Sequence, residues 1–339
     1  MTKARIVDIA GHLPEAILTN TDLAELYPEW PEEKILAKTG IAQRHIAGVT
    51  ETAGDLAYQA ALSLFDQGHC QPQDIDFILL CTQAPDYILP TTACVLQHRL
   101  GIPTTAGALD INLGCSGFVY GLSLAKGLIE TGSANNVLLL TADTYSKYIH
   151  PLDKSVRTLF GDGAAATLVS GNRGNPSGTV GPFVFGTDGA GADHLIIRAG
   201  GFREPATSGN AQVEPDASGN YRSCQHLYMN GAEVMAFSLS AVPKAVTALL
   251  GKLQLEREQI DFFVLHQANQ FMLEALRKKL KIAPEKFPIF VEKVGNTVSS
   301  TIPLTLAHLL EQGQLRHGHR LVLVGFGVGY SWAAAAVTI

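Results

Sequence analysis

Three residues far apart in the chain have side chains that together could carry out covalent acyl chemistry. Cys115 follows a glycine at the start of a helix-like pattern, His266 ends the apolar run FFVL, and Asn296 lies in the turn VGNT. A cysteine can form a thioester, and a histidine with an asparagine can donate hydrogen bonds to a thioester oxygen as negative charge develops there. Taken singly, each residue also has a structural interpretation, as a buried thiol, a core histidine or a helix N-cap. The chemistry therefore depends on whether the fold brings the three together.

The position of Cys115 favours a reactive thiol. The sequence that follows it predicts a helix over 116 to 131, which puts Cys115 at the helix N-terminus. Backbone N–H groups and the positive end of the helix dipole stabilise a thiolate at such a place, so we expect the pKa of Cys115 to be lowered. His266, at the end of a strand, could donate a hydrogen bond or exchange a proton.

An internal repeat relates the segments that carry these residues. The segment IDFILLCTQA recurs as IDFFVLHQA, which aligns Cys81 with His266. The segment that begins LGCSGF recurs as one that begins VGNTVS, which aligns Cys115 with Asn296. Each copy of this second segment predicts a turn, an amphipathic helix that stops at a glycine, and a buried strand. Coincidence is the alternative, but two segments align at nearly one offset.

The repeat predicts two related α/β halves, residues 1–175 and 176–339, joined near GNRGNPSG. Short apolar strands that alternate with helices are typical of parallel sheets covered on both faces. With 339 residues the chain also exceeds the size of a usual single core. The strand ends of two such halves would bring the three candidate residues to one crevice. The segment 200 to 225 lacks periodicity and predicts a surface excursion that covers something.

Composition excludes several classes of function. Charged residues make up 17% and hydrophobic residues 46% of the chain, which describes a compact, enzyme-like protein. The net charge of −6 and the lack of a basic run argue against nucleic acid or a membrane surface as a partner. The N-terminus becomes polar too soon for a signal peptide, and no apolar run approaches a membrane span, so we expect a cytoplasmic protein. Five cysteines without a C-x-x-C pair predict reduced thiols and no metal site.

Two glycine-rich segments also predict local backbone structure. GFGVGYSW (325 to 332) has too few residues after it for a dinucleotide-binding βαβ unit, so its glycines predict close backbone approach and an N–H for an oxyanion hole. LFGDGAAATLV (159 to 169) predicts a structural turn that enters a strand of small residues.

Five motifs, in order along the whole chain, resemble those of the thiolase superfamily, and in particular the β-ketoacyl-acyl carrier protein synthase III family. They are LGCSGF, FGDGAAA, LHQAN, VGNT and GFGVGYSW. The segment KTGIAQRHI (38 to 46) also resembles an N-terminal segment of that family. The resemblance implies a five-layered αβαβα fold made of two duplicated halves with mixed, mainly parallel sheets. It also implies a homodimer, an acyl carrier protein as partner, and no cofactor.

The resemblance also implies a mechanism. Cys115 would take an acyl group from a thioester, and malonyl-acyl carrier protein would bind next. His266 and Asn296 would hydrogen-bond the malonyl thioester oxygen and stabilise the enolate formed on loss of carbon dioxide. The backbone N–H groups of Cys115 and Val328 would bind the tetrahedral oxyanion. Val328 replaces a usual glycine, so its backbone must adopt ordinary angles.

The resemblance also assigns residues that would bind the substrates and residues that would dock the partner protein. Residues expected to bind substrate are Lys38, Leu89, Lys154, Met229, Gly231, Asn269 and Phe271. Residues expected to dock the carrier protein are Arg277, Lys278 and Lys279. Leu89 stands where many relatives carry a phenylalanine that reaches the acyl pocket of the other subunit, so a different or longer acyl chain could fit.

The coenzyme A site of the family is altered here. Lys34, Lys38 and Lys154 stand where relatives have a tryptophan and arginines, and Phe271 replaces another arginine. Lysine keeps the charge but loses the planar, bidentate contacts of arginine. The sequence assigns no role to Trp30. We hypothesise that a carrier protein delivers the acyl group in both half-reactions.

The sequence leaves three alternative functions to be weighed. An enzyme of the same fold could pass the acyl group to an alcohol or amine, or condense without decarboxylation, although the retained Asn296 favours decarboxylation. A cysteine hydrolase would need a G-x-C-x-G elbow, which the sequence GCSG lacks. A non-enzymatic partner subunit is disfavoured by the intact set of Cys115, His266 and Asn296.

Overall fold

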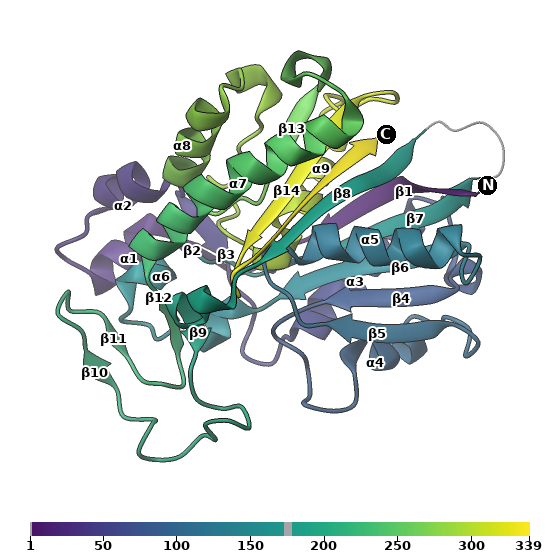
Figure 1. The fold of residues 1–339 in the computed structure, drawn as a ribbon. Coiled ribbons are helices and arrows are strands. Elements are labelled where there is room, and N and C mark those ends of the chain that lie inside the picture. Colours follow the sequence, from purple (N-terminus) through teal and green to yellow (C-terminus); the bar gives the residue numbers. More distant parts are fainter. Residues whose placement is uncertain (1, 173–177) are drawn as a thin grey trace.

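Two large sheets form the frame of the molecule in the computed structural model, which describes residues 2–172 and 178–339 (Figure 1). In spatial order the first sheet contains β1 (Lys3–His12), β7 (Gly163–Asn172), β6 (Asn136–Asp143), β4 (Phe77–Cys81) and β5 (Gly107–Ile111). The second sheet contains β13 (Phe262–Leu265), β14 (Arg320–Gly327), β15 (Ser331–Thr338) and β8 (Thr179–Thr187).

Helices cover both sheets and also separate them. On one outer side lie α3 (Ala53–Asp66) and α4 (Thr92–Arg99), and on the other lie α7 (Gly231–Leu253) and α8 (Gln270–Leu280). Between the sheets lie α5 (Gly117–Glu130) and α9 (Thr301–Glu311), each in contact with strands of both sheets. These central helices are apolar on both sides, as a helix enclosed between two sheets requires. The predicted five-layered αβαβα fold is confirmed.

The sheets are mixed, but strand direction differs from the expected mainly parallel arrangement. Strand β4 runs parallel to β5 and β6, and β13 runs parallel to β14. The pairs β1 with β7, β6 with β7, β14 with β15 and β15 with β8 are antiparallel. Short connections such as the one from β14 to β15 allow only antiparallel pairing. A continuous apolar run reports that a strand is buried on both faces and does not report its direction.

Smaller elements surround the frame. They are β2 (Ile17–Thr19), α1 (Asn20–Leu26), α2 (Glu32–Thr39), β3 (Gln43–His45), α6 (Lys154–Arg157), β9 (Leu195–Ile197), β10 (Glu214–Pro215), β11 (Tyr221–Arg222) and β12 (Leu227–Met229). The segment 200 to 225 is a surface excursion, as predicted, with only β10 and β11 as regular structure. It is fixed to α6 because Arg222 forms ion pairs with Asp153 and Asp216.

The predicted boundary between residues 175 and 176 lies outside the described residues. The strands of the first sheet all end by Asn172, and those of the second begin at Thr179.

Helix α7 corrects one expectation from the sequence. It is long and apolar enough, by length and composition alone, to cross a membrane. In the fold it packs on β8, β14 and β15 and against α8, because its apolar residues cover the outer face of the second sheet. The helix therefore belongs to the core.

Candidate active site

Cys115 lies in the loop between β5 and α5, two residues before the helix begins. Strand β14 of the other sheet passes so close that only glycine fits there. A Cβ on Gly327 would lie 3.0 Å from the Cys115 Sγ, and one on Gly325 would lie 2.7 Å from the Ser116 Cα. The glycines of GFGVGYSW thus serve the close backbone approach that the sequence predicted.

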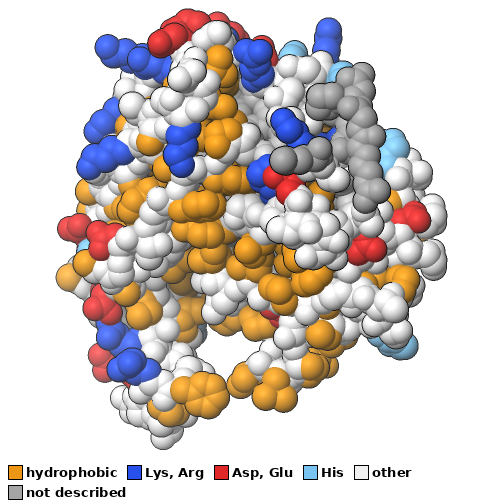
Figure 2. All heavy atoms as spheres, turned by 45° about the vertical axis from the view of Figure 1, so that its right-hand side comes forward, with side chains coloured by type: hydrophobic (Ala, Val, Ile, Leu, Met, Phe, Trp, Pro, Cys, Tyr) orange, Lys and Arg blue, Asp and Glu red, His pale blue; other side chains and the backbone are white. Residues whose placement is uncertain are grey.

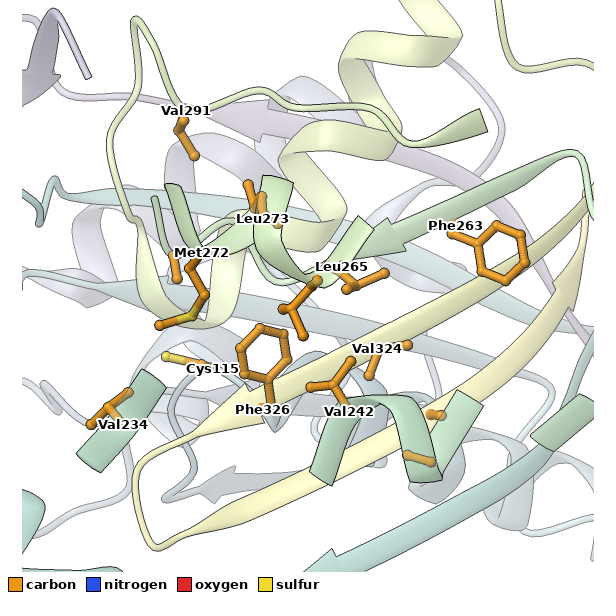
Figure 3. Close-up of a cluster of buried hydrophobic side chains, with 14 of the residues drawn as sticks. Cys115, Val234, Val242, Phe263, Leu265, Met272, Leu273, Val291, Val324 and Phe326 are labelled. Carbon is orange, nitrogen blue, oxygen red and sulfur yellow. The ribbon is translucent and has the colours of Figure 1, made fainter. Parts of the chain in front are cut away.

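The thiol of Cys115 is free and only 5% exposed. Figure 3 shows it within an apolar cluster, beside Met272 and Phe326, which line the same cavity. Burial raises the pKa of Cys115 to about 12, and the nearby Asp143 carboxylate adds to the rise. The pKa therefore moves opposite to the direction predicted from the helix N-terminus, because loss of water around the thiolate outweighs the helix end.

His266 directly follows β13, and its backbone N–H donates to the Val324 carbonyl at 2.8 Å. Its ring is 2% exposed and meets the Phe326 ring edge-on. Its Nδ1 lies 2.7 Å from the Thr301 Oγ1, and that hydroxyl lies 3.1 Å from the Val298 carbonyl oxygen. Burial lowers the pKa of His266 to about 3, so the imidazole is neutral at working pH and carries one N–H.

Asn296 is held on both its backbone and its side chain. Its N–H donates to the Leu159 carbonyl at 2.9 Å, and its own carbonyl accepts from the Gly161 N–H at 3.0 Å. The FGDG turn therefore holds the Asn296 backbone in place, which agrees with the structural role predicted for that turn. The Oδ1 of Asn296 accepts from the Val298 N–H at 2.9 Å, which leaves the amide NH₂ as the donor.

One cavity of about 260 Å³ brings these residues together. Its lining includes Cys115, His266 and Asn296, as well as the predicted substrate-binding residues Lys38, Met229, Gly231, Asn269 and Phe271. The sequence and the family resemblance therefore placed these eight residues where one cavity collects them. Among the described residues, no group of three or more side chains is arranged to hold a metal ion.

Several predicted residues lie elsewhere. Leu89 is 80% exposed and is absent from the cavity wall of this single chain. Lys154 is buried, and its Nζ donates to the Ser218 carbonyl at 2.9 Å and pairs with Glu29.

Two further predictions concern the oxyanion hole and the docking surface. Val328 has no left-handed backbone, as the sequence required. Arg277 is engaged by Glu274 and by the Ile282 carbonyl, whereas Lys278 and Lys279 are exposed at the end of α8.

Trp30 and Thr301 are site residues that the sequence analysis missed. The Trp30 ring lines the cavity mouth, with the Nζ atoms of Lys34 and Lys38 at 5.4 and 5.3 Å from its centroid. Trp30, Lys34 and Lys38 follow one another at intervals of four residues, a helical repeat that could have identified the tryptophan. No spacing in the sequence indicates Thr301, which lies beside His266.

Asp143 was also missed, and it links the end of β6 to the turn that precedes α9. Its Oδ1 accepts from the Gln83 N–H at 2.8 Å, and its Oδ2 accepts from the Ser299 hydroxyl at 2.5 Å. Burial raises the pKa of Asp143 to about 7. The carboxyl group thus ties the end of β6 to the segment that carries Asn296.

Comparison with known proteins agrees with this geometry. The family model described as 3-oxoacyl-[acyl-carrier-protein] synthase III matches residues 109–189, and the model for its C-terminal part matches residues 250–339. The β-ketoacyl-[acyl-carrier-protein] synthase III of Caldanaerobacter subterraneus subsp. tengcongensis is 36% identical over 334 residues, which cover 98% of this chain and 97% of the relative. The chain belongs to the 3-oxoacyl-[acyl-carrier-protein] synthase III family.

Solved structures place the whole fold in this family. A 3-oxoacyl-(acyl-carrier-protein) synthase III with 66% sequence identity has a TM-score of 0.98, with 99% of this chain and 100% of that chain covered. The 3-oxoacyl-(acyl-carrier protein) synthase of Burkholderia xenovorans LB400 is 36% identical with a TM-score of 0.91, and the match covers 99% and 94% of the two chains. The resemblance drawn from the sequence motifs is confirmed.

Proposed function

We propose that the protein is a β-ketoacyl-acyl carrier protein synthase III. It joins an acyl group held on Cys115 to malonyl-acyl carrier protein in a decarboxylative Claisen condensation. The observation that carries this proposal is the single cavity that holds Cys115 together with His266 and Asn296. A thiol nucleophile beside two neutral hydrogen-bond donors suits a thioester whose oxygen gains negative charge.

In the first half-reaction the Cys115 sulfur attacks the carbonyl carbon of a donor thioester. The new S–C bond forms first and gives a tetrahedral intermediate. Its collapse breaks the donor C–S bond, and the departing thiol takes the proton that Cys115 loses. The N–H groups of Cys115 and Val328 stabilise the oxyanion of the tetrahedral intermediate. Because burial keeps the thiol protonated, proton loss accompanies bond formation.

In the second half-reaction His266 and Asn296 donate hydrogen bonds to the malonyl thioester oxygen. The bond to the carboxylate breaks, carbon dioxide leaves, and the enolate carbon attacks the acyl carbonyl on Cys115. The Cys115 sulfur then departs as the β-ketoacyl thioester forms. For the Nε2–H of His266 to donate, its Nδ1 must accept from the Thr301 hydroxyl, whose single proton can serve only one acceptor.

The cavity mouth supports a carrier protein as the donor in both half-reactions. Phe271, 67% exposed, gives the mouth an apolar side where relatives have an arginine. Lys154 is already satisfied by backbone carbonyls and Glu29, so it is poorly placed to hold a nucleotide phosphate. Lys278 and Lys279 lie about two turns along α8 from Phe271, where an acidic carrier could dock while its arm enters the cavity.

We also propose a homodimer that works in the cytoplasm. Strand β5 is at the edge of its sheet and pairs only with β4 among the described residues. Next to it Tyr87, Ile88 and Leu89 are exposed, and Figure 2 shows hydrophobic side chains gathered over much of this side of the molecule. A second copy would cover the edge and the apolar surface. A monomer in sedimentation experiments at micromolar concentration would contradict it.

Intact-protein mass spectrometry tests the proposed activity. The protein is incubated with matched acyl-coenzyme A and acyl-carrier donors, and malonyl-carrier protein is then added while carbon dioxide and the β-ketoacyl product are measured. We expect one acyl mass, faster gain from the carrier donor, and condensation. Cys115→Ala removes the mass gain, whereas Cys224→Ala, at an exposed free thiol, retains it.

The other outcomes separate the alternatives. A mass gain without condensation would favour transfer to an alcohol or amine. No gain from any donor would rule out the covalent mechanism, and rapid loading from coenzyme A alone would rule out the carrier as first donor.

A further inference from the structure

The loop between β14 and β15 lies against the Cys115 turn, although the two belong to different sheets. It joins Gly327 at the end of β14 to Ser331 at the start of β15, and these two residues face each other in the ladder. A Cβ on Gly114 would lie 3.0 Å from the Val328 Cγ1, and one on Gly327 would lie 3.0 Å from the Cys115 Sγ. The loop and the turn are therefore packed together, and the proposed oxyanion hole takes one N–H from each.

Two buried hydroxyl groups join the turn to the loop. The Ser116 Oγ lies 2.7 Å from the Ser331 Oγ, and the Ser331 Oγ lies 3.0 Å from the Val328 carbonyl oxygen. A serine hydroxyl has one proton, and a carbonyl can only accept. The Ser331 proton therefore goes to Val328, and Ser116 donates to Ser331. These hydrogen bonds form one chain from the residue after the nucleophile to the residue that carries the second N–H.

The two hydroxyls are more costly to bury than apolar side chains would be. Ser116 is 1% exposed and Ser331 is 5% exposed, so both hydroxyls have lost their water. A hydrogen bond between such groups contributes little net stability, because water satisfies the same groups in the unfolded chain. The ladder already fixes Ser331 opposite Gly327. The main effect of the hydroxyl chain is therefore to fix the position of the loop relative to the turn.

We infer that Ser116 and Ser331 are positioning residues for the oxyanion hole. Their chain of hydrogen bonds holds the Cys115 turn and the Val328 loop at one separation, so that both N–H groups converge on one oxygen. The inference rests on the proposed function, because it concerns the tetrahedral intermediate on Cys115. Donors stabilise an oxyanion only within hydrogen-bond reach of the place where its charge develops. Misplacement by about 1 Å can lower a rate about a hundredfold, so a smaller shift should lower it about tenfold.

Rates of acyl loading test the inference, with alkylation of the same thiol as the comparison. Loading of Cys115 from an acyl-carrier donor forms an oxyanion, whereas alkylation by iodoacetamide attacks a saturated carbon and forms none. We expect Ser331→Ala to lower the maximal rate of loading about tenfold, with the half-saturating donor concentration and the alkylation rate little changed. Ser116→Ala should lower loading less, because Ser331 can still donate to Val328. Ser331→Thr keeps the hydroxyl and should restore most of the rate.

A double variant separates one shared chain from two independent effects. Ser116→Ala combined with Ser331→Ala should load no more slowly than Ser331→Ala alone, since both hydroxyls act through the Val328 loop. Ser123→Ala is a matched control in α5. Its hydroxyl donates to the Tyr120 carbonyl at 2.7 Å, and its loss should leave both rates unchanged. Circular dichroism checks the fold of each variant.

The possible outcomes are distinct. Both rates are measured by intact mass in a Cys94→Ala, Cys224→Ala background, which removes the two exposed thiols. Loading that is unchanged in Ser331→Ala, or that falls in step with alkylation, would overturn the inference and leave the proposed function intact. Losses that multiply in the double variant would overturn it as well. Absence of loading of the wild-type protein from every donor would instead overturn the proposed function and the inference with it.

Discussion

The two turns that lead into the central helices are aligned by the sequence repeat but differ in structure. The repeat that aligns Cys115 with Asn296 also aligns Gly117 with Val298. The glycine has an ordinary backbone and begins α5, whereas the valine has a φ of 55° and begins a 3₁₀ turn, η6 (Val298–Ser300), ahead of α9. A buried β-branched residue with a left-handed backbone is strained. Val298 therefore has a conformation that a glycine adopts more readily, whereas Gly117 has an ordinary one.

The two turns differ in backbone because the residue at the end of the strand beside each turn differs in size. In the first copy it is Cys81, and a Cβ on Gly117 would overlap its Sγ, so the helix start approaches the strand closely. In the second copy it is the larger His266. There the left-handed Val298 donates its N–H to the Asn296 Oδ1, and its carbonyl oxygen lies 3.1 Å from the Thr301 Oγ1 that also contacts His266. In the proposed mechanism, one turn therefore encloses the nucleophile, and the other orients the two hydrogen-bond donors.

The largest expected effect is the loss of decarboxylation when either hydrogen-bond donor, His266 or Asn296, is removed. His266→Ala and Asn296→Ala should each lower decarboxylation of malonyl-carrier protein by about a hundredfold to a thousandfold, because each removes a hydrogen bond to the developing oxyanion. Loading of Cys115 should remain measurable, since neither residue takes part in that step. Release of labelled carbon dioxide and intact mass report the two steps separately. His98→Ala, on the exposed side of α4, is the control, and unchanged decarboxylation in either variant would refute the assigned roles.

The enclosed nucleophile should titrate as a buried thiol. Burial raises the pKa of Cys115 to about 12, so the thiolate fraction and the rate of alkylation by iodoacetamide should rise about tenfold per pH unit from pH 7 to pH 9. The rate is followed by mass spectrometry in a Cys94→Ala, Cys224→Ala background, which removes the two exposed thiols. A rate that levels off below pH 8 would show that the helix N-terminus dominates after all.

The sequence predicted the parts of the site that depend on residue type and order. Cys115, His266 and Asn296 could be found because the repeat aligns strand ends and turns, and related strand ends meet in the fold. Thr301, Ser331 and Asp143 could not, because their roles arise from contacts between segments far apart in the chain.

Two errors have the same origin. The pKa of Cys115 was predicted from its own helix, whereas it is raised by burial, with β14 of the other sheet packed against the Cys115 turn. Strand direction was predicted from apolar runs, which report burial on both faces but not orientation.

A smaller effect is expected from Thr301, which positions His266. Thr301→Val keeps the shape but removes the hydroxyl that can donate to Nδ1, so the ring is free to adopt the wrong tautomer. Decarboxylation should fall about tenfold, the lower end of the range for removing an orienting partner from a functional histidine. Loading of Cys115 should change much less, and Thr301→Ser should restore decarboxylation. Equal losses in both half-reactions would indicate a general structural defect instead.

The smallest effect concerns the close approach in the first turn. Gly117→Ala should lower the free energy of unfolding by about 1–3 kcal/mol, because the new methyl group overlaps the Cys81 sulfur in a packed core. Gly127→Ala is a matched control in the same helix, with open space around its Cβ, and should be neutral or stabilising by about 0.5–1 kcal/mol. Urea unfolding at one fixed protein concentration provides the measurement. In a Cys81→Ala background the Gly117→Ala cost should shrink by about 1 kcal/mol, since the two side chains compete for one space. Strict additivity of the two substitutions would show that the helix start moves to relieve the overlap, and that this turn is less rigid than the one that carries Asn296.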